Sequence, residues 1–372
     1  MNGDARAAVA RRITAYREAG NAGVLLDDRA LIEVAALRAE LGWPPSGAVP
    51  PEADLRRGLD AAVTAGTFLW LRAQVLPAAD RLDDLLEATE LLTAAREVAP
   101  RSVPRPVARS LAAITGPGRH FDPASVHDQA IDVLSAGAGE LSAIDHAVML
   151  LAAAARSAAG DRYQPYYLSD LGTAWLDRFA ITGRRRDLEN SVAAHERALA
   201  APVPVPEDQA GLLANFSAAL LAQFEHGGDR GQLDHAVVTA RMATDLARSA
   251  AGPAVPEAVI PGPASERAIA VRLAQLSSLS RLRAALLASY EQGGGEVDLD
   301  EAVQVAQEAA SLAPAGDPAH ARYQASLAHL LRLQAARRGT PGAVPPPGTT
   351  PPPAAVPPAP PDEPWRRMLA AG

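Results

Sequence analysis

One stripe of large apolar residues occurs three times in this chain, and this repetition constrains the fold more than any other feature. Each copy places five large residues at i, i+3, i+7, i+8 and i+11, which is one face of an amphipathic helix. The second copy lies forty-five residues after the first, and the third sixty-six residues after the second. The copies are Leu168, Leu171, Trp175, Leu176 and Phe179; Leu213, Phe216, Leu220, Leu221 and Phe224; and Leu279, Leu282, Leu286, Leu287 and Tyr290. Such repetition predicts stacked helical units.

A glycine turn and a second helical pattern follow each stripe. The turns contain Gly183, Gly228 and Gly293, and glycine suits a helix end that requires a left-handed residue. Nine residues after each closing aromatic, a leucine followed by an acidic residue begins a second pattern. At the start of a helix this acidic residue would lie at the positive end of the helix dipole. These patterns are 188–192, 233–237 and 299–303. Each unit is therefore predicted to consist of two helices joined by a short turn.

Looser copies of the second-helix pattern lie upstream, at 144–148, 82–86 and 26–30. Together they predict about six helix pairs. Segments 43–51, 101–118 and 251–265 contain prolines and glycines and are expected to be loops between pairs.

The predicted organisation has four parts. Residues 1–100 would form divergent N-terminal helical pairs, and 101–338 the repeat array. Residues 339–364 would be a disordered Pro-rich linker, in which the segment 341–364 reaches roughly 75 Å at about 3.1 Å per residue. Residues 365–372 would be a short tail or the start of a further element.

The amino-acid composition excludes several classes of function. Ala and Leu dominate the apolar residues and only 4% of residues are aromatic, which favours close-packed helices. The net charge of -8 argues against nucleic-acid binding. The chain has no cysteine and no lysine, which excludes thiolate nucleophiles, Schiff bases and P-loop chemistry. The N-terminus does not read as a secretory signal and no apolar run is long enough for a membrane span, so a cytoplasmic location is expected.

The repeat resembles the tetratricopeptide (TPR) family. The residues that carry the resemblance are Leu168, Leu171, Gly172 and Trp175 on a first helix, and Ala302, Ala306, Ala309 and Pro314 on a second. It covers about residues 61–338 and implies an all-α fold, a right-handed α-solenoid. Two departures are evident. The unit is near 45 residues instead of 34, with the extra length expected between the two helices, and the Gly172 position becomes Ser217 and then Arg283.

The long unit also resembles the divergent TPR arrays that precede CHAT peptidase domains in actinobacterial proteins. Nothing in this chain is similar to the peptidase, which would need a cysteine nucleophile. That resemblance implies a regulatory array whose effector lies beyond residue 372 or on a separate chain.

Few residues in the sequence suggest a catalytic or metal-binding site. Among eight histidines, His226 and His235 bracket the densest group of metal-type side chains, but they straddle a turn, which favours ordinary polar loop residues over a metal site. The basic run 184–186 is either a solvated turn or a docking point for an acidic partner. Gly293 and its neighbours suit a turn better than a phosphate cradle. We expect no catalytic residues, metal or cofactor.

The remaining candidate is the face of the first helices, which line the concave side of a TPR array. Its proposed partner-binding residues, expected on the exposed side of one helix, are Tyr166, Ser169, Asp170, Thr173 and Asp177. The floor in the next two pairs would consist of small residues: Gly211, Ala214, Ala218 and Ala222, then Ser277, Ser280, Ala284 and Ala288. The expected function is an interaction scaffold that binds a protein or peptide, without nucleic acid or membrane. The small residues could equally be tolerant surface positions.

Overall fold

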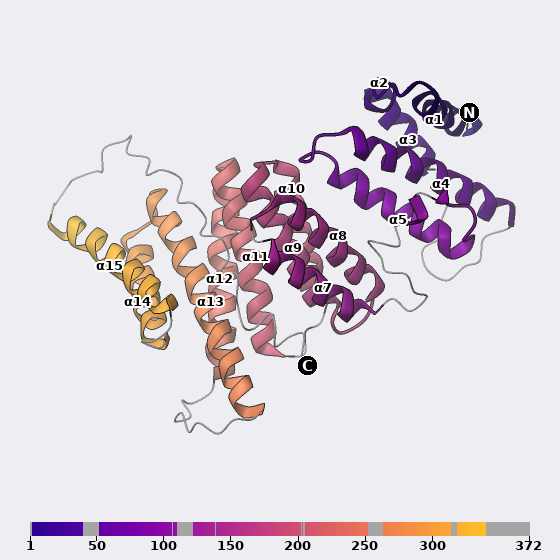
Figure 1. Cartoon of the computed structure of the whole chain (residues 1–372). Coiled ribbons are helices and arrows are strands. Elements are labelled where there is room, and N and C mark those ends of the chain that lie inside the picture. The colour runs from indigo at the N-terminus through magenta and orange to yellow at the C-terminus, as the bar shows by residue number, and fades with distance from the viewer. Residues whose placement is uncertain are drawn as a thin grey trace. The chain divides into compact units, whose positions relative to one another are not determined.

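The computed structural model describes residues 2–39, 52–105, 107–109, 122–137, 139–201, 203, 205–251, 263–313 and 318–339. Within these ranges every regular element is a helix and no strand occurs (Figure 1). The prediction of an all-α protein is therefore confirmed. The expected Pro-rich linker, the terminal tail and most of the expected loops 43–51 and 101–118 lie outside the described residues.

The chain divides into two compact units, Met1–Phe121 and Asp122–Gly372. In the first unit α4 packs along α5, and α1 packs against α3 and α4. Leu25, Leu37, Phe68 and Leu92 are buried in its core. Its helices are α1 (Asn2–Ala19), α2 (Gly23–Leu26), α3 (Asp28–Ala39), α4 (Glu52–Val75) and α5 (Leu82–Val98).

The second unit is a succession of helices, each packed against the next along the chain. In Figure 1 they run from purple to yellow. They are α7 (Pro123–Ala136), α8 (Leu141–Ser157), α9 (Gln164–Thr182), α10 (Arg185–Leu199), α11 (Pro206–Gly227), α12 (Arg230–Ala251), α13 (Pro263–Glu291), α14 (Glu296–Leu312) and α15 (Pro318–Gly339). The three apolar stripes fall on α9, α11 and α13, and the three second-helix patterns on α10, α12 and α14, as predicted.

The predicted glycine turns are present. Gly183, Gly228 and Gly293 have positive φ angles of 64°, 71° and 84°. The amides of Gly183 and Gly228 donate to the carbonyl oxygens of Phe179 and Phe224, the aromatic residues that close their stripes. Only glycine adopts this left-handed conformation without strain, so it ends each first helix and starts the turn to its partner.

One hydrogen bond shows that successive pairs share the same register. The hydroxyl of Ser191 on α10 donates to the carbonyl oxygen of Gly172 on α9, at 2.7 Å. Forty-five residues later, Ser217 on α11 donates to the carbonyl of Ala236 on α12, at 3.0 Å. The two contacts join equivalent positions, with the serine moved from the second helix to the first. The pairs therefore pack at the same place along their stripes.

Four sequence expectations need correction. The extra length of the unit lies in the helices and not between them, since only two residues separate α9 from α10 and α11 from α12. The expected loop 251–265 ends earlier, because α13 already begins at Pro263, where proline suits a first helical turn. The pattern 26–30 does not open one helix. It spans the end of α2 and the start of α3, with the Asp27 carboxylate accepting from the Arg29 amide.

The fourth correction concerns the stripes, because the apolar face of an amphipathic helix is expected to pack inside the protein. Trp175, Leu220 and Phe224 are 4%, 2% and 8% exposed, which confirms that they are buried. Phe179 is only partly buried. It lies in the last turn of α9 and stacks edge-on against His226, with the ring centroids 5.3 Å apart.

Candidate functional site

The five predicted partner-binding residues all lie on α9, but they do not share one environment. Tyr166, Thr173 and Asp177 are partly buried. The Tyr166 hydroxyl donates to the Asp208 carboxylate on α11, at 2.7 Å. Burial and the nearby Asp208 both raise the pKa of Tyr166, so it stays neutral. The Thr173 hydroxyl donates to the Ser169 carbonyl within the helix. These three residues retain some exposure to solvent.

Ser169 and Asp170 were expected on the exposed side, and this expectation is wrong. They are 2% and 8% exposed, because neighbouring helices cover this part of α9. The Ser169 hydroxyl accepts from the Asn215 amide on α11, at 3.2 Å. The Asp170 carboxylate accepts from Nε2 of His127 on α7, at 2.7 Å. Both residues therefore join α9 to its neighbours, and neither is presented to a partner.

The His127–Asp170 contact is an ionisable pair inside the protein. Burial alone would lower the pKa of His127, but the hydrogen bond and the charge of Asp170 outweigh it, so the pKa is raised. The Tyr167 ring lies 4.9 Å from the imidazole and closes the site. The pair resembles a general-base dyad in composition only, because its polar atoms already satisfy each other and both side chains are buried.

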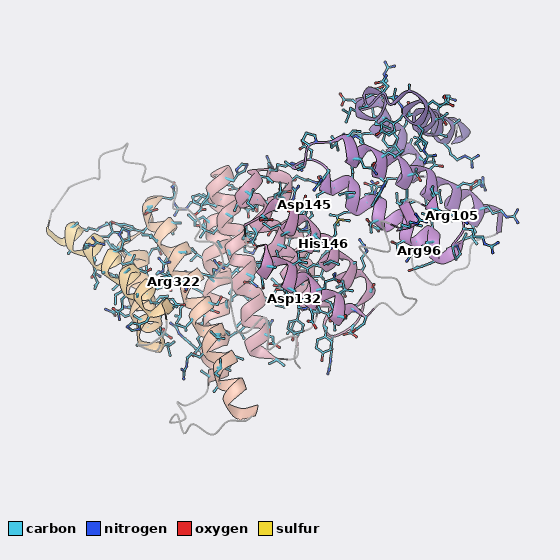
Figure 2. All side chains as sticks on the ribbon, viewed as in Figure 1. Arg96, Arg105, Asp132, Asp145, His146 and Arg322 are labelled. Carbon is cyan, nitrogen blue, oxygen red and sulfur yellow. The ribbon has the colours of Figure 1, made fainter. Side chains whose placement is uncertain are left out.

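A second charged cluster lies near the other end of α9. Arg178 is fully buried, and its guanidinium donates to Asp145 of α8 at 2.8 Å and to both oxygens of Asp187 of α10, at 2.6 and 2.7 Å. Thr182 also donates to Asp187. Figure 2 labels Asp145 on α8. Burial opposes the charge on Arg178, but the two carboxylates outweigh it and raise its pKa. The cluster connects three successive helices.

Between these two clusters, the ring of His195 on α10 packs directly on Gly172 of α9. A Cβ atom at position 172 would lie 2.6 Å from the ring Nε2, so any larger residue would displace the histidine. Close helix approach explains why a glycine occupies this repeat position. Among the described residues neither ring nitrogen of His195 has a hydrogen-bond partner, and burial lowers its pKa to about 4.

Sequence reasoning missed Arg178 and the environment of His195. Arg178 sits on a helix between apolar positions, where an arginine ordinarily reaches solvent. Its partner Asp145 belongs to the copy of the second-helix pattern at 144–148, and Asp187 precedes the copy at 188–192. An acidic residue close to the start of each second helix was the one available signal.

The other sequence candidates have structural partners. His226 stacks on Phe179 and His235 on Phe216. Within the described ranges no three His, Asp or Glu side chains gather as metal ligands would. Arg185 of the basic run is exposed and pairs with Glu189 one turn along α10, at 2.9 Å.

Comparison with known proteins gives no relative: no family model, no curated protein and no solved structure matches this chain. Of the helices in the described ranges, none is both long and apolar enough to cross a membrane.

Proposed function

We propose that this chain is an interaction scaffold, a right-handed TPR-like α-solenoid that binds a protein or peptide along its first helices and performs no chemistry itself. The observation that carries the proposal is the way successive pairs are joined. Besides packing on its own second helix, α11 also packs directly against α9 and α13, the first helices of the pairs before and after it.

The second helices are joined in a different way. Across the last junction, α12 and α14 meet through long side chains, with Arg241 bound to Glu301 and Arg248 to Glu308 by two hydrogen bonds each. Close backbone approach on the first-helix side and long side-chain bridges on the second-helix side favour a stack that curves toward the first helices. That curvature would present α9, α11 and α13 as one continuous surface.

The residues of this surface suit a chain laid across it. On α11 and α13 most of the predicted floor is small and partly buried, and only Ala214 is fully buried. Small side chains allow a partner helix or strand to approach closely. Tyr166 and Asp177 on α9 add an aromatic ring and a charge at one end, the kinds of group that anchor interfaces.

The test is a pair of variants. Tyr166→Ala combined with Asp177→Ala should weaken capture of the natural partner, measured by affinity purification from cells that make the protein. Tyr166→Phe is the matched control, because it removes the bond to Asp208 and keeps the ring. It should capture the partner as the parent does. If the double variant is folded by circular dichroism and recovers the same partners, binding occurs elsewhere.

A further inference from the structure

His195 is the one histidine in the second unit that lies completely inside a helix pair without satisfying its polar atoms. It is 1% exposed, and both ring nitrogens lack a partner in the part of the chain that the structure describes. The ring rests on Gly172 of α9 on one side and lies 6.4 Å from the Phe216 ring of α11 on the other. A neutral imidazole tolerates these surroundings, at the cost of its unmade hydrogen bonds.

A protonated imidazole would not tolerate them. It carries a full charge and two N–H donors, and among the described residues neither nitrogen has a hydrogen-bond partner. The charged groups that act on it come from two elements: Asp170 on α9 attracts the proton and Arg281 on α13 repels it, while from α11 the uncharged Phe216 ring lies nearby. Burial outweighs the attraction of Asp170, and Asp170 is already bound to His127.

We propose that the contact between α9 and α10 is an acid-sensitive joint, which opens when His195 takes up a proton. On opening, α10 moves away from α9 and carries the ring off Gly172. The Ser191–Gly172 hydrogen bond lies one helical turn from His195 and would open with it. The Arg178–Asp187 ion pair fastens the turn between the two helices, so the opening is confined to the part beyond it.

The direction in which pH shifts the closed state follows from the two pKa values of His195. His195 titrates near pH 6.5 once exposed and near 4 while buried. Its contribution to the closed state is complete above pH 6.5 and is lost progressively as the pH falls toward 4. At pH 5 the open form should be favoured about 30-fold more than at pH 7.5. His127 acts oppositely: its pKa is raised, so its contribution is present below pH 6.5 and is lost at higher pH. Acidic loosening therefore does not come from His127.

This joint has a consequence for binding that rests on the proposed function. Tyr166, Thr173 and Asp177, the predicted partner-binding residues that keep some exposure, lie on α9, so separating α10 from α9 would disturb the surface they belong to. The joint itself requires no partner and can be tested without one.

The test is hydrogen–deuterium exchange of the whole chain at pH 7.5 and pH 5, corrected for intrinsic rates. Backbone amides in the parts of α9 and α10 beyond the Arg178–Asp187 ion pair should lose up to about 30-fold in protection at pH 5, whereas α11 and α12 should change much less. His195→Gln and His195→Phe should abolish this selective loss, and His329→Gln, at an exposed position, should leave it unchanged. Retention of the loss in both His195 variants overturns the proposal.

A second measurement uses the parent chain, so that its result does not depend on whether the variants fold. Exchange of the imidazole C–H, measured by mass spectrometry on the peptide that contains His195, reports the pKa of this residue directly. A midpoint well below 6 supports the joint. A midpoint near 6.5, or equal loss of protection in all helices at pH 5, contradicts it.

Discussion

The helix pairs α9–α10 and α11–α12 follow one apolar pattern but differ in what fills their interiors. In α11–α12 the interior is apolar apart from buried hydroxyl groups such as that of Ser217, with Phe216, Leu220 and Leu233 in one core cluster. In and around α9–α10 lie a buried arginine with two carboxylates, a histidine–aspartate pair and an unsatisfied histidine. The same repeat frame therefore accommodates two kinds of core. In the apolar core, stability should fall in proportion to the volume that a substitution removes. In the polar core, stability depends on specific hydrogen-bond and charge partners.

The largest expected effect is at Arg178. Arg178→Met leaves Asp145 and Asp187 buried without their cation, and breaking a buried ion pair in this way costs about 4 kcal/mol of unfolding free energy. Urea denaturation measures the loss. Arg185→Met, at a position with 79% side-chain exposure, is the control and should change stability by less than about 0.5 kcal/mol. Equal, small effects of the two substitutions would mean that the cluster does not hold the pair together.

The apolar pair is tested at Phe224. Phe224→Ala should cost about 3 kcal/mol, because it opens a cavity among Leu220, Leu233 and their neighbours. Phe224→Leu, which keeps most of the volume, should cost less than about 1.5 kcal/mol. Thermal or urea unfolding compares the two. An unchanged transition for Phe224→Ala would show that the stripe on α11 is not the packing face.

A smaller effect separates two glycines on equivalent helices. Gly172→Ala places its Cβ against the His195 ring and should cost about 1–2 kcal/mol after the gain in helix propensity. Gly211→Ala on α11 meets no atom within 4 Å and should stabilise the chain by up to about 1 kcal/mol. Denaturant titrations should therefore show changes in unfolding free energy of opposite sign for the two substitutions. A stabilising Gly172→Ala would disprove the close approach of α10.

The sequence predicted the apolar half of this comparison well. Repeated stripes and glycine turns located α9 to α14 to within a few residues, because periodicity and left-handed glycines are local signals. The polar half depends on distant partners, as Asp145 is 33 residues from Arg178 and His127 is 43 from Asp170. On one helix, Ser169 and Asp170 look like surface residues. Their burial comes from neighbouring helices, with His127 of α7 bound to Asp170 and Asn215 of α11 bound to Ser169.

We propose that the first helices, and not the second, form the binding surface. A photo-crosslinking amino acid placed at position 177 on α9 or at position 238 on α12 tests it directly. Val238 is 53% exposed and Asp177 keeps some exposure to solvent, so a probe at either position can reach a bound partner. In cells that make the protein, irradiation should yield a discrete crosslinked partner from position 177 and none from position 238. The reverse result, or the same product from both positions, would contradict the claim.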